Sequence, residues 1–144
     1  MEFKKEPAIL IATHGPLCQG LIDSSKMIMG EINDIEVLPL LEGMNVEKYE
    51  KEMADIVKKY EGDIVICLDI IGGTPYNTVM KVSRDWELCA VAGVNFPMVF
   101  RAMELRMSGE RNADVYADQM AEAAAEGIKN MNADLRMLHT MSQG

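Results

Sequence analysis

The first residue in this chain that is placed for chemistry is a histidine at the end of a short apolar run. Residues 8–12 are all aliphatic, and Thr13, His14, Gly15 and Pro16 follow them. An uncharged run of this length predicts a strand buried on both faces, as in parallel sheets covered by helices. Ligands of such sheets bind outside the carboxyl ends of the strands, where the next helix begins. His14 is therefore expected at a reactive edge of a sheet.

A carboxylate and a glycine-rich loop follow a second apolar run. Residues 64–68 predict another buried strand, which ends at Asp69 and leads into Gly72-Gly73-Thr74. If the two strands are neighbours, the Asp69 carboxylate can bind one imidazole nitrogen of His14 and fix its tautomer. The other nitrogen is then free to attack an electrophile. His14 and Asp69 are the candidate catalytic residues.

The surroundings of this pair favour a phosphoryl group as the electrophile. Backbone N–H groups of a glycine-rich loop and nearby hydroxyls can together hold an anion. Neither loop contains Lys or Arg, so backbone and hydroxyl dipoles would balance the charge of the phosphate in place of full cations. Such a site is expected to bind the phosphate only briefly. The candidate phosphate-binding residues are Thr13, Gly15, Gly72, Gly73 and Thr74, and no metal site is predicted.

Each of these features also has an ordinary structural explanation. A lone histidine at a strand end is usually structural, Asp69 could cap a helix, and glycine and proline occur in most loops. Their joint placement at one predicted edge of the sheet is what favours a site. The other histidine, His139, is expected to be a bystander, because chain ends are usually weakly ordered.

The rest of the chain predicts the elements that position this pair. Further strands are predicted at 35–40 and 88–92, and Pro39 favours an edge position for the former. Helices are predicted at 17–29, 45–60, 76–82, 97–107 and 114–130, where apolar residues recur every three or four positions. In the first helix the expected inward residues are Leu17, Leu21, Ile28 and Met29. The alternation predicts an α/β fold with an open, mainly parallel sheet of four strands flanked by helices.

The C-terminal segment is more apolar than a free tail usually is. Residues 132–144 include Leu135, Met137 and Leu138. We expect a further antiparallel edge strand here, which could pair with a neighbouring subunit. The predicted organisation is one domain over residues 1–144, with a core from 7 to 130 and this segment as a tail or exchanged strand.

Composition restricts the partners and the compartment. The 144 residues carry a formal net charge of −9, which argues against nucleic acid or an anionic membrane as the main partner. No segment approaches the roughly 20 apolar residues of a membrane span, and the charged residues 1–7 do not fit a secretory signal. The widely spaced Cys18, Cys67 and Cys89 predict neither a disulfide framework nor a CxxC metal site. We expect a cytoplasmic protein.

Three motifs, in this order along the chain, carry a resemblance to a known family. They are Ala12-Thr13-His14-Gly15, then Leu68-Asp69 followed by Gly72-Gly73-Thr74-Pro75-Tyr76-Asn77, and then Ala92-Gly93-Val94-Asn95-Phe96-Pro97-Met98. Together they resemble the mannose-class enzyme IIA components of the bacterial phosphoenolpyruvate-dependent sugar phosphotransferase system. The resemblance extends from Pro7 to Asn130.

The resemblance implies a phosphocarrier. His14 would accept a phosphoryl group from the phosphocarrier protein HPr and pass it to a histidine of a IIB component, with Asp69 orienting His14 and the 72–74 loop around the phosphate. It also implies no metal or cofactor, a homodimer with an exchanged C-terminal strand, and membrane IIC and IID components as indirect partners in hexose uptake. The chain is too short for a fused IIB domain, so a separate IIB is expected.

The sequence departs from the family near the catalytic pair. Ile70 and Ile71 stand where relatives often carry threonine and tryptophan, and Pro16-Leu17 replaces other residues after the histidine. These changes leave the catalytic pair intact and bear on partner preference or sugar specificity.

Three other functions stay open. The phosphotransfer subunit of a dihydroxyacetone kinase resembles this family but serves another acceptor, and a non-catalytic regulatory domain would keep the fold and lose the transfer. A histidine phosphatase would need arginines around the phosphate. The arginines lie far in sequence from both loops; they are Arg84, Arg101, Arg106, Arg111 and Arg136.

Overall fold

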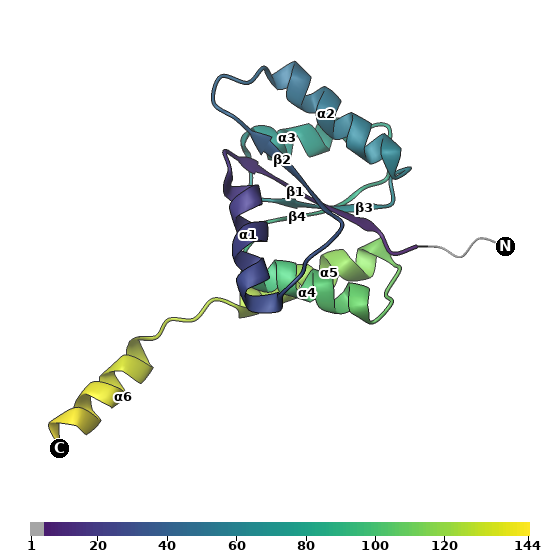
Figure 1. Cartoon of the computed structure of the whole chain (residues 1–144). Coiled ribbons are helices and arrows are strands. Elements are labelled where there is room, and N and C mark those ends of the chain that lie inside the picture. The colour runs from purple at the N-terminus through teal and green to yellow at the C-terminus, as the bar shows by residue number, and fades with distance from the viewer. Residues whose placement is uncertain (1–4) are drawn as a thin grey trace.

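A computed structural model describes residues 5–144 and shows a four-stranded parallel sheet with helices on both faces (Figure 1). The strands are β1 (Ala8–His14), β2 (Ile35–Leu40), β3 (Ile64–Leu68) and β4 (Cys89–Ala92). They lie in the order β2-β1-β3-β4, and every neighbouring pair is parallel. The predicted α/β fold and the edge position of β2 are confirmed. Part of the segment expected not to be a secretory signal, residues 1–4, lies outside the described residues.

Five of the six helices among residues 5–144 form two layers around the sheet, and α6 lies apart from them. They are α1 (Leu17–Met29), α2 (Val46–Lys59), α3 (Gly73–Val82), α4 (Phe96–Met107), α5 (Ala113–Glu126) and α6 (Asn132–Gln143). One core cluster joins α2 and α3 to one face of the sheet, and a second joins α1, α4 and α5 to the other face (Figure 1).

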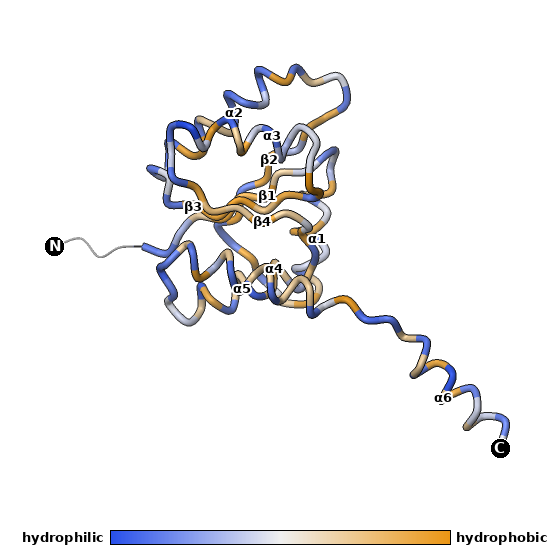
Figure 2. The backbone as a smooth tube through the Cα atoms, turned by 180° about the vertical axis from the view of Figure 1, so that it is seen from behind, coloured by the Kyte–Doolittle hydropathy of each residue, from blue (hydrophilic) through white to orange (hydrophobic). Residues whose placement is uncertain are grey.

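The central strands are apolar, apart from Thr13 and His14 at the end of β1, because both of their faces are covered. In β1, Ile9 and Ile11 belong to the cluster with α1, α4 and α5, whereas Leu10 and Ala12 belong to the cluster with α2 and α3. All five residues of β3 are buried, and the hydropathy of the chain is highest along these strands (Figure 2). Successive side chains of a strand point to opposite faces, so Thr13 and His14 also face opposite layers.

Asparagine side chains begin three of the helices. The side-chain oxygens of Asn45, Asn95 and Asn112 accept hydrogen bonds from backbone N–H groups in the first turns of α2, α4 and α5. Such caps satisfy donors that have no partner within the helix. They also start each helix at a defined residue after its strand or loop.

The inward face of α1 differs from the expected one. Leu21 is buried as predicted, but Leu17 and Ile28 are exposed, and the chain buries Cys18, Ile22 and Ser25 instead. The apolar residues of this helix lie on more than one side, so periodicity alone did not identify the side that meets the sheet. The turn that leads into this helix has Gly15 in the left-handed region, with φ of +59°.

The C-terminal segment is a helix, and the expected edge strand is wrong for this chain. The helix predicted to reach Asn130 ends at Glu126, and α6 follows and projects away from the body (Figure 1). The apolar residues Met131, Leu135 and Leu138 recur at intervals of four and three, the period of a helix face. None of the residues of α6 is buried.

Candidate active site

The sheet order places His14 beside Asp69. His14 ends β1 and Asp69 follows β3, which is the neighbour of β1, with Ala12 opposite Leu68 in the register. The two residues therefore lie at the same edge of the sheet, at the ends of neighbouring strands. The predicted pairing of the catalytic candidates is present in the structure.

One carboxylate oxygen of Asp69 holds His14 twice. Oδ2 accepts a hydrogen bond from the His14 backbone N–H at 2.9 Å and lies 2.8 Å from the ring nitrogen Nδ1. The other oxygen, Oδ1, accepts from the backbone N–H of Ile70 at 3.1 Å. Because a carboxylate can only accept, Nδ1 carries the proton and the neutral ring keeps a lone pair on Nε2.

The carboxylate is held in its charged form. Partial burial raises the pKa of Asp69, but hydrogen bonds from the backbone and ring of His14 lower it by a larger amount. The pKa therefore lies below its usual value. The Asp69 side chain is 12% exposed and that of His14 is 49% exposed. A fixed negative charge thus stands behind a ring whose outer nitrogen is open to an incoming group.

The outer nitrogen of His14 faces the start of α3. Gly72 caps this helix and Gly73 is its first residue, so α3 begins inside the segment expected to be a loop. A side-chain carbon at Gly73 would lie 2.9 Å from Cε1 and 3.3 Å from Nε2 of His14. Only a residue without Cβ lets the ring stand this close to the helix N-terminus. The first N–H groups of a helix have no partner within it and favour an anion.

The loop residues Gly72, Gly73 and Thr74 are therefore placed as a phosphate cradle would require. Thr74 is half-buried, and its hydroxyl has no hydrogen-bond partner among residues 5–144. The N–H groups of Gly73 and Thr74 belong to the first turn of α3. The His14 ring therefore lies beside the first turn of α3.

Two of the expected phosphate ligands do not face this space. The Gly15 N–H is already occupied, because it donates to the Leu40 carbonyl at 2.8 Å. Thr13 is fully buried, and strand alternation turns its side chain to the face opposite His14. Gly72, Gly73 and Thr74 thus stay predicted phosphate contacts, whereas the Gly15 N–H and the Thr13 hydroxyl make structural hydrogen bonds.

An apolar rim around the histidine is a feature that the sequence did not identify as part of the site. Leu17, Leu41, Ile70 and Ile71 are between 48% and 78% exposed, and each lies just beyond the carboxyl end of a strand. Ile70 also lies against the point that a Cβ at Gly73 would take, as does His14. Aliphatic residues that follow three different strands within a few positions were the available signal.

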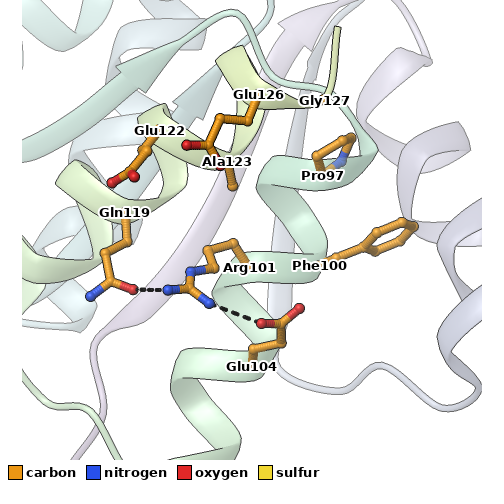
Figure 3. A pocket seen from close by; sticks show the side chains of 9 residues that line it. All are labelled: Pro97, Phe100, Arg101, Glu104, Gln119, Glu122, Ala123, Glu126 and Gly127. Atoms are coloured by element: carbon orange, nitrogen blue, oxygen red, sulfur yellow. Dashed lines mark hydrogen bonds and ion pairs between the residues drawn. The ribbon is translucent and has the colours of Figure 1, made fainter. Parts of the chain in front are cut away.

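The arginines and the cavities lie elsewhere. A cavity of about 460 Å³ lies between α4 and α5, where Arg101 binds Glu104 and Gln119 (Figure 3). Arg106 donates to the carbonyls of Asn33 and Asp34. Neither cation is available to clamp a phosphate at His14, as a histidine phosphatase would require.

His139 lies on the projecting α6 and is exposed (Figure 1). Within residues 5–144, no group of three or more His, Cys, Asp or Glu side chains could hold a metal ion. The same residues contain no helix that is both long and apolar enough to cross a membrane.

Comparison with known proteins gives a consistent assignment. The family model described as PTS system fructose IIA component matches residues 8–119. The fructose-specific EIIA component of Bacillus subtilis is 29% identical, over 90% of this chain and 96% of its own length. The mannose-specific EIIAB component of Escherichia coli is also 29% identical over 88% of this chain, which spans 40% of that longer protein.

Solved structures have the same fold. The crystal structure of a phosphotransferase system component EIIA from Streptococcus agalactiae has a TM-score of 0.79 at 23% identity, covering 88% of this chain and 98% of that one. The family model covers most of the chain and includes His14, Asp69 and the start of α3. This protein therefore belongs to the EIIA family of the sugar phosphotransferase system, whose members take part in phosphotransfer during sugar uptake.

Proposed function

We propose that Nε2 of His14 accepts a phosphoryl group from the phosphohistidine of HPr and passes it to a histidine of a IIB component. The observation that carries this proposal is the double hydrogen bond from His14 to Asp69 Oδ2, at 2.9 and 2.8 Å. It fixes the tautomer in which Nε2 has the free lone pair. An imidazole held in this way is a nucleophile without a separate base.

The transfer exchanges one nitrogen–phosphorus bond for another. The Nε2 lone pair of His14 attacks the phosphorus of the donor phosphohistidine, and the donor nitrogen leaves with the electron pair of the broken bond. Asp69 stabilises the positive charge on the His14 ring, and the α3 N-terminus and the Thr74 hydroxyl stabilise the phosphoryl oxygens. In the second transfer, an imidazole nitrogen of IIB attacks the phosphorus, and Nε2 of His14 leaves with the electron pair of the broken bond.

The rim around His14 suits a protein partner. The rim consists of four exposed aliphatic side chains, Leu17, Leu41, Ile70 and Ile71. A group of exposed aliphatic side chains is unusual on a surface that contacts only water. A donor protein must bring its imidazole within bonding distance of Nε2. A donor that is this close would also contact the rim. Binding would exclude water from the phosphoryl group during transfer.

We further propose a hexose as the sugar served, with membrane IIC and IID components as indirect partners. Support comes from the relatives, which are named fructose-specific in Bacillus subtilis and mannose-specific in Escherichia coli. We also propose that the protein forms a homodimer in which the apolar face of α6 is covered. Twelve residues make a marginal helix in water without such packing.

The test is to incubate the protein with phosphoenolpyruvate, enzyme I and HPr and to follow its intact mass. We expect a gain of one phosphate that is labile in acid and stable in base, absent from His14→Ala and retained in His139→Ala. Adding a purified IIB should remove it. Phosphate that remains on His14→Ala would refute the mechanism, and no gain in a folded protein with active HPr would favour a regulatory domain or a different donor.

A further inference from the structure

The Thr13 hydroxyl connects the end of β1 to the beginning of α1. Thr13 is fully buried, and its Oγ1 accepts a hydrogen bond from the Cys18 backbone N–H at 2.9 Å. Cys18 is the second residue of α1, and Pro16 at the cap position provides no side-chain hydrogen bond. Thr13 therefore caps this helix from within the strand, five residues upstream of the amide that it satisfies.

The turn that carries His14 is held from three directions. The Thr13 hydroxyl binds α1, the Gly15 N–H donates to Leu40 at the end of β2, and His14 donates to Asp69 at the end of β3. The first of these bonds is buried, whereas the bond to Asp69 is at the surface. Two of the three attachments hold residues on either side of His14.

We propose that Thr13 is a positioning residue whose hydroxyl sets the place of the His14 imidazole relative to the start of α3. Thr13 acts through the backbone, because its side chain lies on the face of β1 opposite His14. Without the hydroxyl, the Cys18 N–H loses its acceptor in a buried position, and a shift of α1 or of the turn would satisfy it again. This role rests on the proposed transfer at His14, but the position of the ring can be measured without any transfer.

The ring has little room to move without consequence. Its Nε2 stands 3.3 Å from the point that a Cβ at Gly73 would occupy. A displacement of about 1 Å at a reacting group can cost on the order of 100-fold in rate. Loss of the Thr13 hydroxyl is therefore expected to slow the transfer by about 10- to 100-fold, although Thr13 touches neither phosphate nor partner.

The test compares Thr13→Val, which removes the hydroxyl at nearly constant size, with Thr13→Ser, which keeps it. Ile11→Val is the matched control, since Ile11 is buried on the same face of the same strand and has no part in the turn. Two measurements are made on the full chain: the ring ¹⁵N NMR signals of His14 without any donor, and the rate of phosphorylation by phospho-HPr. We expect Thr13→Val to shift the ring signals and slow the transfer, and Thr13→Ser and Ile11→Val to resemble the wild type.

The outcomes separate this proposal from the proposed function. A folded Thr13→Val with unchanged ring signals and an unchanged rate overturns the positioning role. Equal slowing in Ile11→Val and Thr13→Val, with unmoved ring signals, also overturns it and leaves only a contribution to stability. If the wild type is not phosphorylated, the function fails, while the ring signals still decide whether Thr13 positions His14.

Discussion

At the level of single residues, the charge of Asp69 contributes both to the site and to the stability of the fold. Its pKa in the folded chain lies below the value of about 3.9 of an unfolded chain. The ionised carboxylate therefore stabilises the fold above that pH, and this contribution is lost as the pH falls through the folded-state pKa.

Asp69→Asn tests this charge directly. The difference in free energy of unfolding between the wild type and Asp69→Asn is expected to be largest at pH 7 and to become smaller toward pH 3. Urea titrations at both pH values measure this difference. The phosphorylation rate at pH 7 should fall by about 10²- to 10⁴-fold, because the amide no longer fixes the tautomer. Asp63→Asn, at the opposite end of β3, is the control and should retain the phosphorylation rate of the wild type. An Asp69→Asn variant that is phosphorylated as fast as the wild type would contradict the role of the carboxylate.

Gly73 tests the close approach of the ring to α3. Gly72 and Gly73 have φ of +81° and +83°, so alanine at either position is expected to cost about 1–3 kcal/mol of stability. Only at Gly73 would the new Cβ meet the His14 ring, at 2.9 Å from Cε1. Gly73→Ala should therefore slow phosphorylation at least tenfold relative to Gly72→Ala, measured by mass gain over time. Equal rates in the two variants would show that the approach is not needed.

At the level of elements, Asn95 joins two helices as well as capping one. Its side-chain oxygen accepts from the Met98 N–H at 3.1 Å, and its Nδ2 donates to the Ala124 carbonyl of α5 at 3.0 Å. Asn45, by contrast, makes only exposed cap bonds at the start of α2. Thermal or urea unfolding should show a loss of about 1 kcal/mol for Asn45→Ala and about 2–3 kcal/mol for Asn95→Ala. Equal losses would mean that the bond to α5 adds nothing.

The elements also show which parts of the structure a sequence can predict. The apolar runs at 8–12 and 64–68 predicted buried strands, and the neighbouring position of these strands brings together His14 and Asp69 as expected. The ligand roles of Thr13 and Gly15 could not be excluded beforehand. They depend on which helices cover each face of β1 and on the bond from Gly15 to β2, both of which arise only in the assembled sheet.

At the level of the whole molecule, α6 is the one helix among residues 5–144 that buries no residue. None of its residues is buried, and it projects from the body after Gly127 (Figures 1 and 2). Its apolar face was visible in the sequence, but the choice of helix over strand depends on the period of Met131, Leu135 and Leu138, since apolar content is compatible with both.

Removing residues 131–144 tests whether α6 links two copies. The truncated chain should keep its fold, because the deleted residues bury no side chain against the body. If α6 joins a dimer, the full chain has a melting temperature that rises with protein concentration, and the truncated chain does not. Calorimetry and sedimentation at several concentrations measure both properties. A truncated chain that dimerises as well as the full chain would contradict the proposed role of α6.

The distance along the chain between His14 and Asp69 has a consequence for synthesis. His14 and Asp69 are 55 positions apart, and the glycine against the ring comes still later. A growing chain on the ribosome therefore has its histidine long before it has β3 or α3, and domains fold only once such distant partners are present. A half-made chain cannot bind Nδ1 or cradle phosphate. Under the proposed function, phosphate on His14 would therefore mark a chain that has been translated and folded at least through α3.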